Sequence, residues 1–358
     1  MLRRRVLSSS LAMLSVNLTM SRSQSMASAN SDRPRKIAQI GTAHAHASGK
    51  MSAMRALPEL WEVLGVSETD PELRRLAEKS SAYAELPFLS EAEILNQSDL
   101  TTVVVETRIE DSCTTALNCL RAGKNVHLDK PGALDHADFK AMRLEAERLG
   151  LVVQMGYMLR YNPAFELLFQ SVKEGWLGEI TEIDAAMGKL ADPGTRKTLA
   201  ALEGGGMFEL ACHVIDAAVT ILGKPREVRA FSTPVGDDGT KDNQTAVLVY
   251  PHATAVIRCN HADPFGGPRR RFNVTGTEGT LEIVPLESGR INLSLSKARG
   301  NYRKGHQSIE IEIPKGRYDR EFVDLAEVVA GKKPLAWDAV HDIAVHETVL
   351  RAAGVWRE

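Results

Sequence analysis

From about residue 36 to residue 156, short apolar runs alternate with longer amphipathic segments. The short runs, rich in β-branched side chains, predict strands, and the segments with apolar residues every three to four positions predict helices. The expected strands are 36–41, 62–68, 101–107, 126–129 and 152–156, and the expected helices are 48–57, 71–80, a segment ending near Ala122, and 134–149. This alternation favours a doubly wound parallel sheet.

Beyond about Gly178 the pattern changes to consecutive strands separated by turn residues. The expected strands are 181–187, 226–232, 244–250, 253–260, 271–275 and 280–283, and helices are expected at 318–329 and 339–353. Consecutive strands favour a mixed or largely antiparallel sheet. The predicted fold class is therefore α/β, with a parallel N-terminal sheet and a C-terminal α+β region built on a large, open, mostly antiparallel sheet.

The first 29 residues have the pattern of an export signal. Arg3, Arg4 and Arg5 precede a weakly apolar run over 6–20, and the small residues at 27–29 offer a cleavage site. The run is too short to span a bilayer, and the arginine cluster resembles a twin-arginine signal. We therefore expect an exported, periplasmic protein with no stable membrane insertion of the mature chain. An ordinary secretory signal or a misassigned start codon are the alternatives, and the latter would leave the protein in the cytoplasm.

Composition limits the partners of the chain. It has 358 residues, 43% of them hydrophobic, which is enough for two domains. The net charge is −2, and because residues 1–29 hold four arginines and no acid, the remaining chain has a net charge of −6. That balance gives no electrostatic footprint for nucleic acid. The four cysteines lack C-x-x-C or zinc-ligand spacing, so we expect buried or free thiols.

The segment 122–131 (AGKNVHLDKP) ends in a lysine placed for chemistry. Its pattern predicts a helix end, a buried strand, and then Lys130 immediately before Pro131. Open α/β sheets bind ligands at the C-terminal edges of their strands. Lys130 is therefore expected to lie at a ligand-binding edge.

A second segment, 204–216, begins with three glycines and continues as a helix. At about 100° per residue, Glu209, His213 and Asp216 share a polar stripe opposite an apolar face. We therefore expect one amphipathic helix that shows Glu209 and His213 together. The alternative is a solvated i,i+4 pair without a chemical role. If Lys130 and His213 converge, they supply a charge and a proton acceptor for carbinol chemistry.

The loop after the first strand departs from the dinucleotide-binding fingerprint. That fingerprint is G-x-G-x-x-G, whereas residues 41–46 are GTAHAH and keep only the first glycine. Ala43 could still let the backbone approach a pyrophosphate, but His46 occupies the position of closest helix–strand packing. We expect His44 and His46 to pack against the nucleotide or donate hydrogen bonds to it. No third ligand accompanies them in the sequence, so no metal site is predicted.

The second strand ends at an acid suited to a nucleotide ribose. Glu68 lies 22 residues beyond His46, near the place where dinucleotide-binding folds carry an acid for the ribose hydroxyls. A carboxylate there repels a 2′-phosphate, so NAD is expected and NADP is disfavoured. Glu68 could instead help Asp70 cap the helix that begins at Pro71, and both roles are compatible.

Taken together, these segments resemble the Gfo/Idh/MocA superfamily of NAD(P)-dependent oxidoreductases. The superfamily segment A-G-K-x-V-x-x-E-K-P is matched by 122–131 with Asp129 in place of Glu, and D-x-G-x-H-x-x-D resembles 209–216 with Glu209 in place of Asp. Further matching segments are 156–163, 177–180 and 276–280. The resemblance implies a Rossmann-type NAD-binding domain over 35–157 and a substrate-binding α+β domain over 158–358, whose last helix could pack back toward the N-terminal domain.

The motifs and the resemblance together imply roles for individual residues. Lys130 and His213 would be catalytic, with Lys130 binding the reacting oxygen, His213 exchanging its proton, and Glu209 binding a substrate hydroxyl. The expected cofactor-binding residues are Gly41, Thr42, Ala43, His44, Glu68, Thr107, Asp129 and Lys130, and the expected substrate-binding residues are Arg160, Tyr161, Asn162 and Glu209. Arg160 could equally form an interdomain ion pair.

The expected function is that of an NAD-dependent oxidoreductase that transfers hydride between nicotinamide and a carbinol of a sugar, cyclitol or related polyol. Two alternatives remain open: an NAD-dependent glycosidase of the same superfamily, and a non-catalytic relative that binds a nucleotide or a sugar. The glycosidase would release free aglycone without net NADH. A homo-oligomer could form through the C-terminal sheet.

Overall fold

The computed structural model describes residues 33–357, and the predicted export signal lies outside them. Five strands form the first sheet, in the order β2-β1-β3-β4-β5. They are β1 (Arg35–Ile40), β2 (Trp61–Ser67), β3 (Leu100–Val105), β4 (Asn125–Leu128) and β5 (Val153–Met155). All neighbours pair in parallel, which confirms the expected doubly wound sheet.

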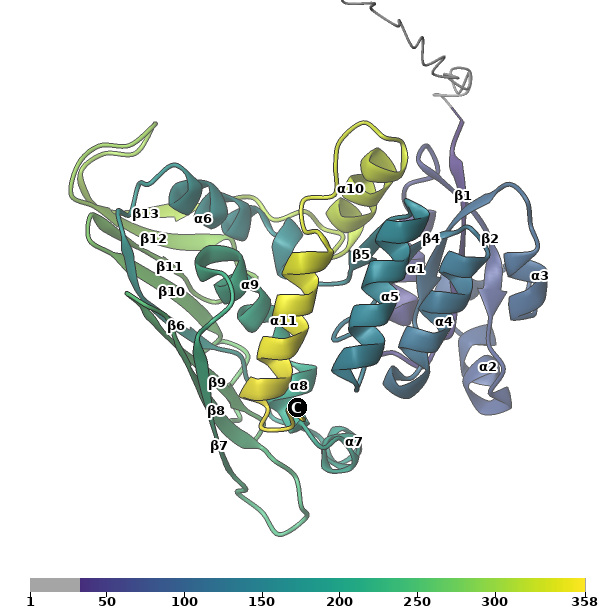
Figure 1. Cartoon of the computed structure of the whole chain (residues 1–358), viewed down its shortest axis with the longest axis horizontal. Helices are drawn as coiled ribbons and strands as arrows, with labels where there is room; N and C mark the ends of the chain where they lie inside the picture. Colours follow the sequence, from purple (N-terminus) through teal and green to yellow (C-terminus); the bar gives the residue numbers. More distant parts are fainter. Residues whose placement is uncertain (1–32, 358) are drawn as a thin grey trace, which may run out of the picture. The chain divides into compact units, whose positions relative to one another are not determined.

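Helices connect these strands and cover the sheet. They are α1 (Ala47–Arg55), α2 (Pro71–Glu78), the short η1 (Ser81–Tyr83), α3 (Glu91–Leu95), α4 (Ile109–Arg121) and α5 (His136–Leu149). Helix α4 packs against α5, and α1 packs against α10 (Asp319–Val329) (Figure 1). The side chain of Asp70 accepts hydrogen bonds from the backbone N–H groups of Glu72 and Leu73, so it caps α2 as the sequence indicated.

The strand order creates a ligand-binding edge. The chain passes from β1 to β2 on one side and then returns to β3 on the other side of β1. Ligands bind at the carboxyl ends of strands where the order reverses in this way. Gly41, Glu68, Glu106 and Asp129 follow β1, β2, β3 and β4 directly, so the topology brings them to one edge.

Eight strands form the second sheet, in the order β13-β12-β11-β10-β6-β9-β8-β7. They are β6 (Ile180–Ala186), β7 (Glu227–Thr233), β8 (Asn243–Val249), β9 (Thr254–Asn260), β10 (Arg271–Gly276), β11 (Gly279–Ile283), β12 (Arg290–Leu295) and β13 (Gly305–Glu310). Only β6 and β9 pair in parallel, so the expected mostly antiparallel sheet is confirmed. Strands β12 and β13 were not expected from the sequence.

The remaining helices are η2 (Met158–Tyr161), α6 (Pro163–Lys173), α7 (Pro193–Ala201), α8 (Gly205–Glu209), α9 (Cys212–Leu222) and α11 (Ala339–Ala352). Figure 1 shows α6, α9 and α11 along one side of the second sheet. Alternate residues of β8 and β9 are buried, as expected for strands with one covered face.

The prediction of one amphipathic helix through Glu209 and His213 was wrong. The chain breaks at Leu210 and Ala211, which separate α8 from α9. Every residue from Cys212 to Val219 is buried, because α9 contacts β6 and β9 as well as α11. A helix enclosed in this way has no solvated face, so its polar side chains face protein partners or a ligand.

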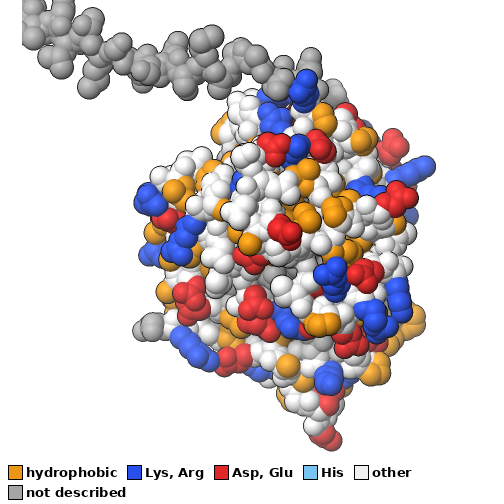
Figure 2. All heavy atoms as spheres, turned by 90° about the vertical axis from the view of Figure 1, so that its right-hand side faces the viewer, with side chains coloured by type: hydrophobic (Ala, Val, Ile, Leu, Met, Phe, Trp, Pro, Cys, Tyr) orange, Lys and Arg blue, Asp and Glu red, His pale blue; other side chains and the backbone are white. Residues whose placement is uncertain are grey.

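Helix α11 joins the two sheets through its contact with α5. The ring of His346 stacks on Phe139 at 4.3 Å between centroids, and Nε2 of His346 lies 2.9 Å from the carbonyl oxygen of Ala133. None of the described helices is long and apolar enough to cross a bilayer. Acidic and basic side chains are interspersed on the face shown in Figure 2.

Candidate active site

The loop after β1 turns sharply at Gly41. Its φ is +89°, and a Cβ there would lie 2.6 Å from the backbone nitrogen of Thr107, so only glycine fits. The loop therefore lies directly against the end of β3. Helix α1 begins at Ala47, and His46 in front of it makes no side-chain cap. The N–H of Ala47 donates to the carbonyl oxygen of His44, so the N–H groups of Ser48 and Gly49 are those left for an anion such as a phosphate.

Glu68 is held toward this loop. Its Oε2 accepts hydrogen bonds from the backbone N–H of Thr42 at 2.8 Å and from Oγ1 of Thr42 at 2.7 Å, and its Oε1 accepts one from the N–H of Asp70. The carboxylate therefore supports the loop and the start of α2 at once. These contacts are compatible with both expected roles of Glu68, binding the ribose hydroxyls and helping Asp70 to cap α2. Thr107 lies two residues after the end of β3, and its hydroxyl donates to the carbonyl of Arg108.

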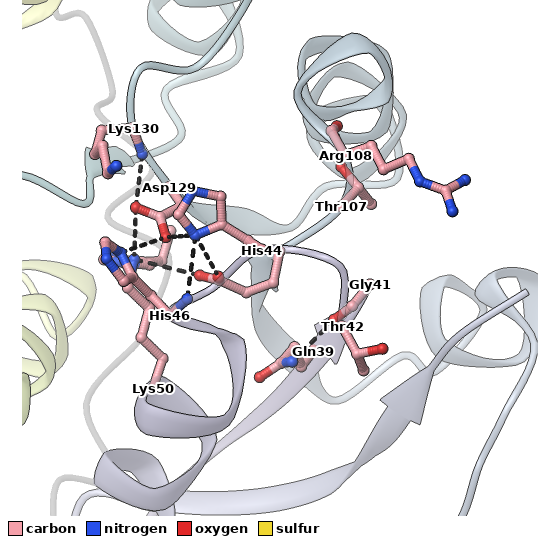
Figure 3. A network of polar contacts seen from close by, with 12 residues as sticks. Gln39, Gly41, Thr42, His44, His46, Lys50, Thr107, Arg108, Asp129 and Lys130 are labelled. Carbon is pink, nitrogen blue, oxygen red and sulfur yellow. Dashed lines mark hydrogen bonds and ion pairs between the residues drawn. The ribbon is translucent and has the colours of Figure 1, made fainter. Parts of the chain in front are cut away.

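A cluster of buried charges fills the edge below the loop (Figure 3). Nζ of Lys50 lies 3.2 Å from Oε1 of Glu106, 3.2 Å from Oδ1 of Asp129 and 2.9 Å from Nε2 of His127. Burial opposes the charge on Lys50, but these two carboxylates raise its pKa above the ordinary value. Burial also raises the pKa of Glu106. A Cβ on Gly156 would lie 2.5 Å from Nζ of Lys50. The ion pairs of Lys50 therefore require a glycine at position 156, directly after β5.

Two histidines face the other oxygen of Asp129. Nδ1 of His44 lies 2.6 Å from Oδ2, and Nδ1 of His46 lies 3.1 Å from the same atom. Figure 3 shows both rings pointing from the loop toward Asp129, while Arg108 extends away. Burial opposes ionisation of Asp129, but His44, Lys50 and His46 hold its pKa well below the ordinary value. Burial lowers the pKa of His46 to about 4, although Asp129 opposes this.

Lys130, two residues after β4, contacts Glu209 at the end of α8. Nζ of Lys130 donates to the carbonyl oxygen of Glu209 at 2.7 Å and to its Oε1 at 3.0 Å. Lys130 lowers the pKa of Glu209 to about 2. Burial opposes the charge on Lys130, but Glu209 raises the pKa of the ammonium above its ordinary value. An ammonium has three donors, so one N–H of Lys130 is left for another acceptor.

His213 lies beside this pair but is buried. Its Nδ1 has no hydrogen-bond partner among the described residues. The ring centroid lies 6.4 Å from that of His46 and 6.0 Å from that of Tyr157. Burial first, and then the charge of Lys130, hold the pKa of His213 well below its ordinary value. The imidazole is therefore neutral, which a proton acceptor requires.

Three of the four predicted substrate residues make structural contacts. Arg160 is buried, and its guanidinium lies 2.7 Å from Asp216 and 2.7 Å from Asp342. It therefore forms an ion pair, but with partners inside the 158–358 region and not the interdomain pair that the sequence left open. Tyr161 packs edge-on against Trp337. Asn162 caps α6 by accepting the N–H of Ala164. Among the described residues, none of these three side chains has a recorded contact with Lys50, Glu106, Asp129, His44 or His46.

Sequence reasoning missed several residues that the fold brings to the edge. Lys50 and Glu106 were not expected there, and neither was Tyr318, whose ring lies 5.6 Å from that of His46. A signal for Lys50 existed, because it lies one helical turn after His46 and so shares its face of α1. Glu106 directly follows β3 and would have been found from the rule that strand ends carry ligand-binding residues.

Sequence comparison matches two segments of the chain to known families. Residues 35–157 match the oxidoreductase family with an NAD-binding Rossmann fold, and residues 165–282 match the GFO/IDH/MocA C-terminal domain. The chain belongs to the Gfo/Idh/MocA family of oxidoreductases. The predicted family and the NAD-binding oxidoreductase class are thereby confirmed.

Curated relatives of this family member are distant. The uncharacterized oxidoreductase YhhX of Escherichia coli (strain K12) is 26% identical over 209 residues, which are 57% of this chain and 59% of YhhX. Trans-1,2-dihydrobenzene-1,2-diol dehydrogenase of Bos taurus is 29% identical over 195 residues, 54% of this chain and 57% of that enzyme. The chain thus spans less than two thirds of the length of these relatives.

Solved structures share the fold of this family member. Levoglucosan dehydrogenase, in complex with NADH and levoglucosan, superposes with a TM-score of 0.78 at 18% identity, covering 90% of this chain and 97% of that one. An oxidoreductase from Agrobacterium radiobacter, in complex with NAD+, L-tartaric acid and magnesium, gives 0.77 at 16% identity, covering 90% and 96%. At these identities the likeness concerns the fold alone.

The edge fits an NAD nucleotide despite its unusual loop. Gly41 gives the close approach of loop to β3, the start of α1 keeps uncapped N–H groups, and Glu68 presents a carboxylate fixed by Thr42. Ala43 and Ala45 leave the loop backbone partly accessible. His44 and His46 lie between the loop and Asp129, with Nδ1 of each within 3.1 Å of Oδ2 of Asp129.

Proposed function

We propose that this protein is an NAD-dependent dehydrogenase that moves hydride between nicotinamide and a carbinol carbon of a sugar, cyclitol or related polyol. The proposal rests on a buried ammonium, Lys130, fixed by Glu209 after β4, and on His213, whose Nδ1 has no partner among the described residues and whose pKa the charge of Lys130 helps to lower. Relatives named as dehydrogenases of a diol and of levoglucosan support an alcohol substrate.

Lys130 binds the reacting oxygen in this proposal. Two of its donors are held by Glu209, so the third can point at a substrate hydroxyl without losing either contact. A fixed cation stabilises the negative charge that develops on the oxygen as its proton leaves. Because Glu209 keeps the pKa of Lys130 above its ordinary value, the side chain stays charged throughout.

His213 takes the hydroxyl proton during oxidation and returns it during reduction. A base must be unprotonated before the reaction, and burial together with Lys130 keeps it so by lowering its pKa. A substrate hydroxyl that donates to Nδ1 would give a partner to a buried atom that has none among the described residues. Glu209, partly exposed beside Lys130, would accept a hydrogen bond from a second substrate hydroxyl.

The cofactor would be held by residues along the same edge. NAD supplies the hydride acceptor or donor when it is bound. Gly41, Thr42, Ala43 and the start of α1 would hold the pyrophosphate, and Glu68 would accept hydrogen bonds from the ribose hydroxyls. His44, Thr107, Asp129 and Lys130 would line the rest of the nucleotide site.

Nucleotide analysis followed by a substrate screen tests this function. Purified protein is denatured, and any released nucleotide is identified by mass spectrometry. The protein is then supplied with NAD and a panel of sugars, cyclitols and linear polyols, and NADH formation is recorded. We expect bound or titratable NAD and reduction of NAD by at least one polyol class. Binding of no nucleotide, or NAD binding with no oxidation of any alcohol, would overturn the proposal.

We further propose that the mature protein begins near Asn30 and is exported. The support is the run of arginines, the apolar segment and the small residues at 27–29. N-terminal sequencing of the native protein decides this. A native protein that begins at Met1 in the cytoplasm would contradict it.

A further inference from the structure

Two histidines and a carboxylate place three metal-ligand atoms together. Nδ1 of His44, Nδ1 of His46 and a carboxylate oxygen of Asp129 all lie within 4.8 Å of one another. Two of the separations are 2.6 Å and 3.1 Å. A first-row divalent ion holds such atoms at about 2.0–2.2 Å, which leaves neighbouring ligands about 3.3 Å apart. Movements smaller than about 1 Å would therefore bring all three into one coordination sphere.

Glu106 gives a second and independent sign that this position favours a cation. Its side chain is fully buried, and its Oε2 has no hydrogen-bond partner among the described residues. That oxygen points toward the histidines, 3.6 Å from Nδ1 of His44. A buried carboxylate oxygen without a partner is costly. A cation held by His44, or a water bound to that cation, would satisfy it.

Lys50 contacts one oxygen of each of the two carboxylates, and it leaves the other oxygen of each available to a metal ion. Lys50 faces Oδ1 of Asp129 and Oε1 of Glu106, which leaves Oδ2 and Oε2 on the side of the histidines. Two buried carboxylates share this one ammonium, so the charge of the second carboxylate is neutralised either by a proton or by a bound cation. Contacts from outside the coordination sphere commonly orient a ligating carboxylate in this way.

We propose that His44, His46 and Asp129 bind a divalent first-row transition-metal ion, with Glu106 beside the open coordination positions. Imidazole nitrogens suit zinc, cobalt, nickel and iron(II), whereas magnesium and calcium prefer oxygen ligands alone. Three protein ligands leave room for a water or a substrate oxygen, as in catalytic metal sites. The proposal departs from the expectation of no metal site, because Asp129, the third ligand, comes from the distant strand β4.

The competing explanation uses the same atoms with protons in place of the metal. Nδ1–H of His46 would then donate to Oδ2 of Asp129. Nδ1 of His44 would either carry a proton toward the same oxygen at 2.6 Å or accept the backbone N–H of His46 at 3.3 Å. The two explanations differ in one measurable way, since only the metal site binds a transition metal stoichiometrically.

Cobalt titration of the untagged, full-length protein distinguishes them. The protein is treated with a chelator, dialysed, and titrated with Co²⁺ in the absence of NAD and substrate, while the visible absorption of the ion is followed. We expect one Co²⁺ per chain, displaced by Zn²⁺. Zn²⁺ should also raise the melting temperature of the wild type.

Variants locate the site. Removal of a residue outside the coordination sphere commonly weakens metal binding by about 10–100-fold. We therefore expect Glu106→Gln to fall in that range, and His44→Asn and His46→Asn each to weaken Co²⁺ binding by about 100-fold or more. His252→Asn is the matched control, because it removes an exposed histidine between β8 and β9 and should leave Co²⁺ binding unchanged.

The proposal is overturned if the wild type binds no stoichiometric Co²⁺, if His44→Asn and His46→Asn bind it as the wild type does, or if His252→Asn loses as much affinity as they do. Circular dichroism of each variant shows whether it is folded. None of these measurements depends on NAD or on turnover. A negative result would therefore leave the proposed dehydrogenase function untouched.

Discussion

We compare two buried clusters of charged residues within 33–357. Their difference distinguishes a structural role from a ligand-binding role. The arginine cluster consists of Arg143, Arg160, Asp216 and Asp342 and joins η2, α9, α5 and α11. The edge cluster consists of Lys50, Glu106, Asp129, His44 and His46 at the carboxyl ends of β1, β3 and β4. Both clusters are buried or nearly so, and both contain residues that sequence motifs singled out.

The arginine cluster is balanced in charge. Two guanidinium groups face two carboxylates, with contacts of 2.7 Å and 2.9 Å, and Arg143 also donates to the carbonyl oxygen of Val153. The edge cluster has two carboxylates for one ammonium, and burial raises the pKa of Glu106, so either a proton or a bound cation neutralises the second carboxylate. Both clusters contain a buried atom without a hydrogen-bond partner among the described residues, Oε2 of Glu106 in one and Nε of Arg143 in the other. The clusters therefore differ in their balance of charge, and we expect a ligand to bind where carboxylates outnumber cations.

The largest expected effect is on turnover, at the residues beside the edge cluster. His213→Asn and Lys130→Met should each reduce the rate of hydride transfer by about 10²–10⁴, the usual contribution of a general acid or base. The measurement is single-turnover reduction of bound NAD by the best polyol of the screen. Substantial turnover by His213→Asn at every pH would move the proton acceptor elsewhere, and His127 would be the next residue to replace.

Stability serves as the control for those variants. The sequence suggested that His213 lies away from the packed face, but only about 2% of the residue is exposed, so His213→Asn will also lower the melting temperature somewhat. Lys130→Met keeps a flexible apolar chain of similar length. If turnover falls in Lys130→Met while the melting temperature and NAD affinity stay close to those of the wild type, the loss belongs to the chemistry.

The next largest effect is on stability, in the arginine cluster. Arg160→Met leaves Asp216 and Asp342 buried without their shared cation, and breaking a buried pair in this way typically costs about 3–5 kcal/mol. We expect urea unfolding to show a loss of that order. A loss below about 1 kcal/mol, the range of exposed ion pairs, would mean that the cluster does not brace the fold and would reopen a substrate role for Arg160.

These clusters also show how far the sequence could be interpreted. Periodicity located the five strands of the first sheet and six of the eight strands of the second, because each has an apolar pattern and turn residues at its ends. Strand β13 (residues 305–310) is rich in polar residues, so its hydrophobic signal is weak. Strand β12 (residues 290–295) alternates buried apolar with polar residues, a period-two signal that was present in the sequence and was missed. The motifs placed Lys130, Glu209 and His213 correctly in one region, since strand ends and glycine-rich turns are local features.

Partners distant in sequence could not be predicted. Whether Arg160 faces a substrate or Asp216 depends on how η2 packs against α9, and no local pattern encodes that contact. The break between α8 and α9 was missed for a similar reason, because helical periodicity continues through Leu210 and Ala211 in the sequence. The third metal-ligand candidate, Asp129, required the register of β4 beside β3.

A smaller effect, on the pH dependence of stability, tests whether a buried carboxylate near the edge cluster lacks partners for its charge. Glu321 is buried near His127 at 3.7 Å and has no hydrogen-bond partner for either oxygen among the described residues. Burial raises its pKa to about 7. Because the folded pKa exceeds the ordinary value of 4.5, Glu321 favours the folded state fully below pH 4.5, and this contribution is lost as the pH rises through about 7.

Glu321→Gln should therefore flatten the pH dependence of stability. We expect the wild type to lose on the order of 2 kcal/mol between pH 4.5 and pH 8 relative to this variant. Urea unfolding at a series of pH values, with a chelator present, gives the difference. Parallel curves for the two proteins would show that Glu321 is already ionised in the folded protein at low pH and that its charge is relieved by contacts we have not assigned.

The smallest expected effect concerns Glu68, a carboxylate outside both clusters. It is half-buried and satisfied by Thr42 and the N–H of Asp70, so it resembles the arginine cluster in having partners, yet it lies at the ligand edge. Its charge would repel a 2′-phosphate. The cation of Arg108, held 2.8 Å from Asp70, lies along the same edge and would be left to attract that phosphate once Glu68 is gone.

Glu68→Ser should therefore shift cofactor preference from NAD toward NADP by about tenfold, equivalent to about 1.4 kcal/mol. Titration of both nucleotides against the wild type and the variant measures the shift. Glu72→Gln is the matched control, because it removes an exposed carboxylate four residues away, in the first turn of α2, and should leave the preference unchanged. Tighter NADP than NAD binding by the wild type would remove Glu68 from the ribose site. An equal shift in both variants would mean that general charge near α2, and not the fixed carboxylate of Glu68, sets the preference.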